Sequence, residues 1–292
     1  MNKLIYTLCF GLLSVCCLSL QAEVLHTEKS LYRNIEVYEE DDLLCLRFGR
    51  YNGTRQSCMN LANPDLLEFN YTRMMMGALY LNPNPQRALI LGLGGSSLPN
   101  ALRKLYPNLQ IDVVEIDAAV IRVAKEYFGF KPSSLTRATE ADGRVFVKRA
   151  LSQPTRYDLI MLDAFDQEYI PEHMLTREFL TEIRGLLTEQ GVLAANTFSS
   201  SRLYNYESVT YQTVFGDFYN LKDANRVILI RRNGLPEITE VKRNADTLAS
   251  KLKPLGVISD WLLPKFSKNK DWPASTRVLT DQYSPANLLN TN

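Results

Sequence analysis

The chain has 292 residues, enough for one large domain or for a domain with a smaller extension. Its 33 Lys and Arg residues balance 32 Asp and Glu residues, so the formal net charge is only +1 at pH 7. This balance argues against nucleic acid as a partner and against electrostatic attachment to an anionic membrane, because both require an excess of basic side chains.

The first 22 residues have the pattern of a secretory signal peptide. Lys3 precedes an apolar run over residues 4–20, and Ala22 precedes the acidic Glu23. A basic start, a short apolar stretch and a small residue at the cut are typical of such signals. We expect cleavage after Ala22, an exported mature protein in the periplasm or outside the cell, and no membrane span after cleavage. The alternative is an uncleaved anchor, although the run is short for a span of about 20 residues.

Residues 23–62 alternate apolar and polar positions and predict a small antiparallel β domain. Two of the five cysteines, Cys45 and Cys58, would remain after cleavage. They lie on predicted strands at 43–48 and 56–59, joined across a turn at 51–54. A disulfide is common in an oxidising compartment. Because the sequence does not fix the strand register, a disulfide and two buried thiols are equal alternatives.

Residues 63–235 alternate predicted strands with predicted helices. The strands are expected at 88–91, 111–114, 135–139, 157–162, 191–196 and 226–230, and the helices at 66–80, 144–151, 175–187 and 204–215. Such alternation predicts an α/β fold with a doubly wound parallel sheet. We interpret residues 236–292 as a C-terminal extension with a polar helix at 242–252 followed by coil.

A glycine-rich turn follows the first of these strands. Gly92, Gly94 and Gly95 leave little side-chain bulk there, and Ser96 or Ser97 would cap the next helix. The following strand ends in an acid, Glu115, and Asp117 is expected to cap the helix after it. Strand, glycine turn, helix, strand and acid together make half of a Rossmann-like nucleotide-binding unit.

Four acids are predicted to lie at the carboxyl ends of parallel strands, where open α/β sheets bind ligands: Glu115, Asp142, Asp163 and Asp166. Glu115 is placed to accept hydrogen bonds from a ribose, and Asp142 from an adenine amino group. Asp163 and Asp166 should face the transferred group or its acceptor. The spacing of potential ligands predicts no metal site. The two histidines, His26 and His173, are expected on the surface rather than in catalysis.

The chain resembles the spermidine synthase family of polyamine aminopropyltransferases over residues 30–230. The motifs that carry the resemblance are SLYRNIEV at 30–37, EFNY at 68–71, VEID at 114–117, DG at 142–143 and DAFD at 163–166. The resemblance implies a methyltransferase-type α/β domain behind a small β domain. It also implies that decarboxylated S-adenosylmethionine is the co-substrate and that a polyamine such as putrescine is the acceptor.

The resemblance assigns roles to individual residues. Tyr71 would contact the acceptor, Glu115 would bind the ribose and Asp142 the adenine. Asp163 would hold and deprotonate the attacking amine, with Asp166 and Tyr71 positioning it.

Two departures from the family pattern keep other functions open. Gly95 stands where the family has an acid that binds the aminopropyl ammonium, and Arg33 stands where it has a Gln. One alternative is a methyltransferase that uses ordinary S-adenosylmethionine. Another is a non-catalytic, exported polyamine-binding protein. The oligomeric state is also open, with a homodimer among the alternatives.

Overall fold

The structure is a computed structural model and describes residues 22–49, 55–165 and 170–285. Most of the predicted signal peptide and the turn at 51–54 therefore lie outside the described residues. None of the helices in the described part has the length and apolar character that crossing a bilayer requires.

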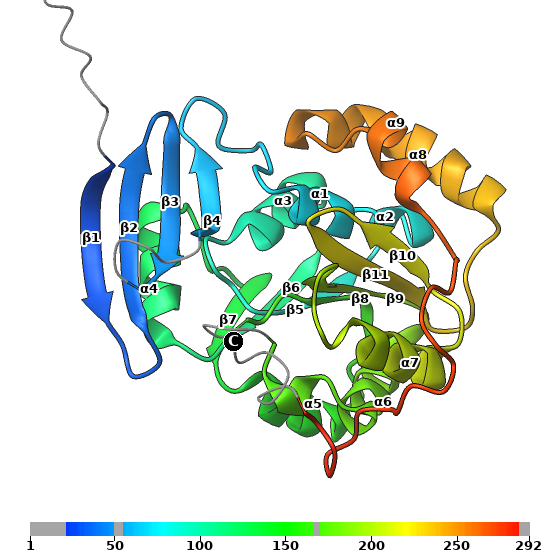
Figure 1. Cartoon of the computed structure of the whole chain (residues 1–292). Helices are drawn as coiled ribbons and strands as arrows, with labels where there is room; N and C mark the ends of the chain where they lie inside the picture. The colour runs from blue at the N-terminus through cyan, green and yellow to red at the C-terminus, as the bar shows by residue number, and fades with distance from the viewer. Residues whose placement is uncertain (1–21, 50–54, 166–169, 286–292) are drawn as a thin grey trace, which may run out of the picture.

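The N-terminal part forms a four-stranded antiparallel sheet, as predicted (Figure 1). Its strands, in spatial order, are β1 (Glu23–Lys29), β2 (Asn34–Glu40), β3 (Leu43–Phe48) and β4 (Arg55–Asn60). Cys45 and Cys58 are paired across β3 and β4 and form a disulfide. The register that the sequence left open thus places the two cysteines opposite each other, so the disulfide alternative holds.

The second sheet has seven strands in the order β10-β11-β9-β8-β5-β6-β7. Their bounds are β5 (Arg87–Leu91), β6 (Gln110–Glu115), β7 (Thr136–Glu140), β8 (Tyr157–Leu162), β9 (Leu187–Phe198), β10 (Tyr219–Lys222) and β11 (Asn225–Arg231). The parallel prediction is correct for the five strands from β9 to β7 and wrong for β11, which is antiparallel to both of its neighbours, β9 and β10. The reason is the order of the last two strands. β10 keeps the direction of the parallel strands, and the tight turn of a hairpin then reverses the chain, so that β11 lies between β10 and β9 and runs against both.

Helices cover both faces of this sheet, as expected for a doubly wound fold. In Figure 1, α1 (Asn70–Met75), α2 (Ala78–Leu81), α3 (Ser97–Leu105) and α8 (Ile238–Leu252) lie on one face, and α5 (Gly143–Leu151), α6 (Arg177–Leu186) and α7 (Tyr204–Phe215) on the other. Helix α4 (Ala118–Tyr127) packs on the first face beside the N-terminal sheet. Alternate residues of β5 serve the two cores: Ala88 and Ile90 point to one, and Leu89 and Leu91 to the other.

The predicted helix at 66–80 is wrong in its extent, because it begins later and is interrupted. Leu67 pairs with Met59 in an isolated bridge and donates its N–H to the carbonyl of Leu255, so this part of the chain is held by tertiary contacts. The break falls at Gly77, where a Cβ would lie only 2.9 Å from the carbonyl oxygen of Met74. The methionines of this segment are buried in the core, as their spacing predicts.

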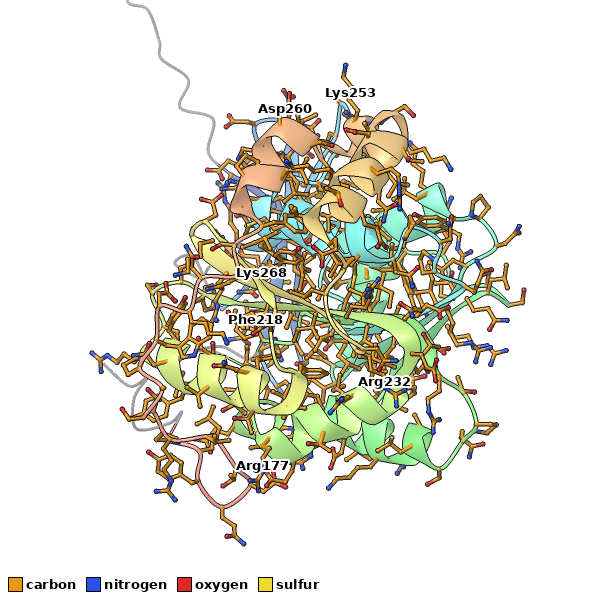
Figure 2. All side chains as sticks on the ribbon, turned by 90° about the vertical axis from the view of Figure 1, so that its right-hand side faces the viewer. Arg177, Phe218, Arg232, Lys253, Asp260 and Lys268 are labelled. Carbon is orange, nitrogen blue, oxygen red and sulfur yellow. A yellow bond between two sulfur atoms is a disulfide. The ribbon has the colours of Figure 1, made fainter. Side chains whose placement is uncertain are left out.

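The C-terminal segment packs against the sheet domain. After α8 it forms α9 (Ser259–Leu262) between the short 3₁₀ helices η2 (Lys253–Leu255) and η3 (Leu263–Lys265), and then mostly coil. Phe218, labelled in Figure 2, stacks on Trp272 with ring centroids 5.3 Å apart, and this contact holds the coil near β10.

Candidate active site

A pocket lies at the carboxyl ends of β5, β6, β7 and β8. The chain passes from β5 outward to β7 and then returns to β8 on the other side of β5, which is the switch point where open α/β sheets bind ligands. The pocket has about 1080 Å³ of empty space, part of which is open solvent at its mouth. Phe48, Gln56 and Ser57 close one side, so the N-terminal sheet forms part of the wall.

The three glycines of the turn after β5 differ in backbone conformation and in the space around them. Gly92 has φ +97°, and a Cβ on it would lie 2.2 Å from the backbone oxygen of Asp163, so a side chain is excluded. Gly94 has φ +50°, and the nearest atom to an added Cβ would be Cβ of Ser57, at 4.0 Å. Gly95 has an ordinary backbone, but a Cβ would lie 2.6 Å from Oγ of Ser57 and 3.1 Å from Phe128.

The predicted serine cap of α3 is wrong. Ser96 occupies the N-cap position with φ +58°, and its side chain makes no capping hydrogen bond to the helix backbone. Its hydroxyl instead donates to the backbone oxygen of Phe128 over 3.1 Å. The left-handed backbone needed to complete the glycine turn determines this orientation.

Glu115 is fixed at the end of β6 by two backbone donors. Its Oε2 accepts from the N–H of Leu93 at 3.0 Å and its Oε1 from the N–H of Asp117 at 3.1 Å. Burial raises the pKa of Glu115, and the two N–H groups oppose that shift. Asp117 caps α4 as predicted, by accepting from the N–H of Ala119. The two backbone donors thus hold the Glu115 carboxylate rigid. Each of its oxygens keeps one further lone pair that can accept a hydrogen bond from a ligand in the pocket.

Arg33 spans from the N-terminal sheet to the loop after β8. Its guanidinium lies 4.2 Å from the centre of the Phe48 ring, and its Nη1 donates to the backbone oxygen of Phe165 over 3.2 Å. Its Nε is 3.9 Å from Oδ2 of Asp117 and is buried without a hydrogen-bond acceptor. A cation with one unused donor therefore borders the pocket.

Asp163 lies between Tyr71 and Asn196. Its Oδ1 accepts from the Asn196 amide at 2.9 Å, and its Oδ2 lies 3.3 Å from the Tyr71 hydroxyl. Burial raises the pKa of Asp163 to about 7, although both hydrogen bonds lower it. Burial and the nearby Asp163 also raise the pKa of Tyr71 well above its ordinary value. An acid that titrates near neutrality, next to a pocket, is a candidate proton acceptor.

Asn196 was not singled out from the sequence. The signal was present, since a polar residue at the carboxyl end of the fifth predicted strand obeys the same rule as the four acids.

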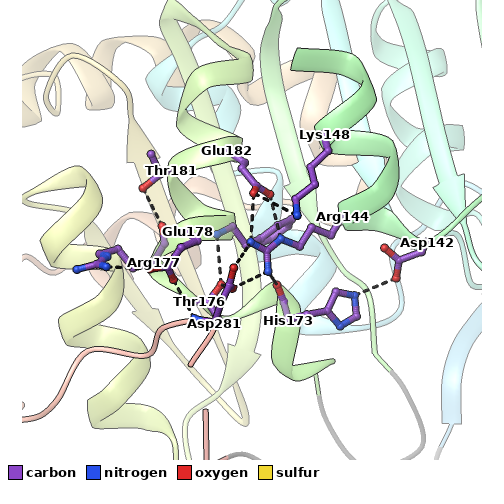
Figure 3. Close-up of polar contacts among 11 residues, drawn as sticks. Asp142, Arg144, Lys148, His173, Thr176, Arg177, Glu178, Thr181, Glu182 and Asp281 are labelled. Atoms are coloured by element: carbon purple, nitrogen blue, oxygen red, sulfur yellow. Dashed lines mark hydrogen bonds and ion pairs between the residues drawn. The ribbon is translucent and has the colours of Figure 1, made fainter. Parts of the chain in front are cut away.

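Asp142 serves two partners at the start of α5. Its Oδ1 caps the helix by accepting from the N–H of Val145 at 2.9 Å, and its Oδ2 lies 2.9 Å from Nε2 of His173 (Figure 3). His173, predicted to be a surface residue, has a side chain that is 45% exposed, but it sits on the pocket wall. It belongs to η1 (Glu172–Met174), which follows β8 in the chain.

A cluster around Arg144 holds this wall in place (Figure 3). The guanidinium donates to both carboxylate oxygens of Glu182 and to both of Asp281, over 2.6–3.1 Å, and also to the backbone oxygen of His173. Arg144 holds the pKa of Asp281 below its ordinary value. The cluster joins α5, α6, η1 and the C-terminal coil, and the sequence alone carried no signal for it because its members are far apart in the chain.

The structure brings most of the predicted site residues to one pocket. These are Tyr71, Gly92, Gly94, Gly95, Glu115, Asp142 and Asp163. Asp166 lies outside the described residues. Within the described ranges, no group of three or more His, Cys, Asp or Glu side chains has an arrangement that could hold a metal ion.

Comparisons with known proteins agree with this geometry. The family model for the spermine/spermidine synthase domain matches residues 68–228. A polyamine aminopropyltransferase of Vibrio vulnificus is 46% identical over 275 residues, which cover 92% of each chain.

Two solved structures share the fold. A spermidine synthase in complex with the transition-state analogue AdoDATO matches with a TM-score of 0.66 and 19% identity, over 84% of this chain and 85% of that one. Human methyltransferase-like protein 13 in complex with SAH matches with a TM-score of 0.58 and 24% identity, over 74% of this chain and 100% of that one. At these identities the two structures show the fold alone. The family model and the Vibrio vulnificus relative carry the assignment: this chain belongs to the spermine/spermidine synthase family.

Proposed function

We propose that the protein transfers an aminopropyl group from decarboxylated S-adenosylmethionine to a small amine or polyamine such as putrescine. The observation that carries the proposal is Asp163, a pocket acid whose pKa is raised to about 7 and whose carboxylate is held by Tyr71 and Asn196. Membership of the family and the 46% identity to a polyamine aminopropyltransferase support it.

The nucleoside would occupy the side of the pocket formed by β5, β6 and β7. The Glu115 carboxylate offers acceptors to the two ribose hydroxyls, because its backbone partners fix its orientation. An adenine amino group would donate to Asp142 beside His173. Leu91 and Met174 supply apolar surface for the base on the same wall. The sulfonium then lies between Glu115 and Asp163.

In the transfer step the amine nitrogen attacks the aminopropyl carbon bonded to sulfur. A C–N bond forms, the C–S bond breaks, and its electron pair stays on sulfur, which leaves as a neutral thioether. The amine must lose a proton, and Asp163 is the acceptor. An alkylammonium and an ordinary carboxylic acid differ by about 6 pKa units, roughly 8 kcal/mol. Raising the pKa of Asp163 to about 7 reduces this difference by about half.

A methyltransferase that uses ordinary S-adenosylmethionine is the second candidate, and one observation favours it. The carboxylates on the described part of the pocket wall are Glu115, Asp142 and Asp163, and none of them lies in the glycine turn. Arg33 adds a cation with an unused donor. The carboxylate of ordinary S-adenosylmethionine would therefore meet less repulsion here than beside an acid at position 95.

Calorimetric titration with each sulfonium compound, followed by product analysis with putrescine, tests the proposal. Aminopropylated product together with methylthioadenosine is expected. A methylated acceptor instead would establish the second candidate. Putrescine binding with no turnover of either sulfonium compound would favour a non-catalytic polyamine-binding protein.

We also propose that the protein is exported and that the mature chain begins at Glu23. The signal-like pattern of residues 1–22 supports this, and so does the Cys45–Cys58 disulfide, since disulfides persist in oxidising compartments. Mass spectrometry of the protein from a periplasmic extract should give the mass of residues 23–292. A product that still starts at Met1 would contradict the proposal.

A further inference from the structure

The turn between β10 and β11 supports both members of the Asp163–Tyr71 pair from behind. Nδ2 of Asn225 donates to Oδ1 of Asn196 over 3.1 Å, and Nδ2 of Asn196 donates to Oδ1 of Asp163 over 2.9 Å. Asp223 in the same turn accepts from Asn70, the residue before Tyr71, at 2.8 Å. The backbone N–H of Asp223 donates to the carbonyl of Asn225, which ties the two supports together.

The two asparagines have a fixed polarity. An amide has an acceptor at one end and donors at the other. Because the ionised carboxylate of Asp163 can only accept, the Asn196 nitrogen faces it and the Asn196 oxygen accepts from Asn225. Asn196 is itself 3% exposed, so water has little access to its side-chain amide. One oxygen of Asp163 is thus committed to a rigid N–H donor, while Oδ2 has only the longer contact to the Tyr71 hydroxyl.

We propose that Asn225 and Asn196 are positioning residues that form an amide relay. The relay keeps Oδ1 of Asp163 as a hydrogen-bond acceptor and leaves Oδ2 to take the proton from the attacking amine as the C–N bond forms and the C–S bond breaks. This inference rests on the proposed aminopropyl transfer. It assigns a function to an edge hairpin that lies outside the parallel part of the sheet.

Other titratable and charged groups also act on Asp163, and the test must separate their effects. Tyr71 faces it from α1, Glu115 raises its pKa from the end of β6, and Arg33 contacts the loop that follows it. Neither Asn196 nor Asn225 carries charge. Their effect on Asp163 must therefore come through hydrogen bonding, which stabilises the ionised form.

The experiment measures kcat/KM for putrescine against pH in wild type and in Asn196→Ala. Wild type should show an inflection near pH 7, since Asp163 must be ionised to act. Asn196→Ala should move it upward by about one pH unit, a roughly tenfold change in the ionisation constant. Activity lost at pH 7 should return largely by pH 9. Thr197→Val is the matched control, because Thr197 adjoins Asn196 on β9 and the change removes a buried hydrogen bond to the backbone oxygen of Arg226 on β11. It should leave the inflection in place.

Asn225→Asp tests the relay at a distance. A carboxylate at 225 accepts from the Asn196 amide and turns it round, so that the Asn196 oxygen faces Asp163 and the inflection again moves upward. The new charge could produce a similar shift directly. The double variant Asn196→Ala/Asn225→Asp separates the two, because a relay effect disappears in the Asn196→Ala background and a charge effect persists.

Asp163 can also be followed without turnover, by its carboxyl carbon-13 resonance, assigned by its absence in Asp163→Asn. If wild type makes no aminopropyl product and this resonance still titrates higher in both variants, the relay stands and the proposed function fails. If Asn196→Ala lowers the rate equally at every pH and leaves the titration of Asp163 unchanged, Asn196 is only structural and the relay is overturned.

Discussion

The side chain of Ser57 fills the space that a side chain on Gly95 would need. A Cβ on Gly95 would lie 2.6 Å from Oγ of Ser57 and 2.8 Å from its Cβ. The Ser57 hydroxyl also lies 3.2 Å from that of Ser97 at the start of α3. Ser57 of the N-terminal sheet therefore leaves no room for a side chain at position 95. An acid introduced at 95 would need the space that Ser57 occupies.

We expect wild type to bind decarboxylated and ordinary S-adenosylmethionine with similar affinity, or to prefer the ordinary compound. Gly95→Asp alone should weaken both because of the contact with Ser57. Ser57→Gly/Gly95→Asp should admit the carboxylate and shift preference towards the decarboxylated compound by about 1–3 kcal/mol. Paired calorimetric titrations at one ionic strength measure this, with Ser57→Gly as the control. A wild type that already prefers the decarboxylated compound a hundredfold would contradict the expectation.

Glu115→Ala should weaken binding of an adenosyl ligand such as methylthioadenosine by about 1.5–3 kcal/mol, the range for hydrogen bonds to a charged group. It should also lower the free energy of unfolding, because the N–H groups of Leu93 and Asp117 lose their acceptor. Glu115→Gln keeps one carbonyl oxygen and should cost less on both counts. Equal affinity of all three proteins would mean that Glu115 serves only the turn.

Asp163 should reduce stability above neutral pH. Its pKa rises from 3.8 to about 7 on folding, so the folded state binds more protons than the unfolded state between these values. The free energy of unfolding therefore falls as pH rises from about 4 to 7 and stays lower above. Asp163→Asn lacks this cost. Thermal unfolding should show a larger advantage of Asp163→Asn over wild type at pH 8 than at pH 4.5, and an advantage independent of pH would contradict this origin.

The disulfide should contribute measurably to stability. It closes a loop with a sequence separation of 13, for which the chain-entropy estimate is about 3 kcal/mol. Cys45→Ser/Cys58→Ser should unfold at a lower temperature than oxidised wild type, and reductant should lower the midpoint of wild type only. Because Ser57 and Gln56 adjoin Cys58 and line the pocket, ligand affinity should fall as well.

Local pattern was sufficient for much of the fold. The strand Tyr157–Leu162 and the helix Tyr204–Phe215 have the bounds that the sequence predicts. Gly92, Glu115 and Asp163 were found because each belongs to a strand end, and strand ends in a parallel sheet share one edge. The residues expected to bind the nucleoside can thus be predicted from short segments of the sequence.

What the sequence could not give depends on contacts between distant segments. Ser57 borders Gly95 only because β4 folds over the glycine turn, and Arg144 meets Asp281 across most of the second half of the chain. The antiparallel hairpin at 219–231 was missed because β10 has only four residues, too few for a clear period. Asn196 could have been predicted, because it lies at the carboxyl end of a parallel strand, where ligands bind. That rule was applied only to acidic residues.

The Arg144–Asp281 contact has a consequence for when the pocket is completed. The glycine turn, Glu115 and Asp163 all precede Asp281 in the chain. Until that residue arrives, Arg144 lacks one of its two carboxylate partners, and the wall that carries His173 is held less firmly. We therefore expect the sheet to form first and nucleoside affinity to be acquired last, once Asp281 has bound Arg144.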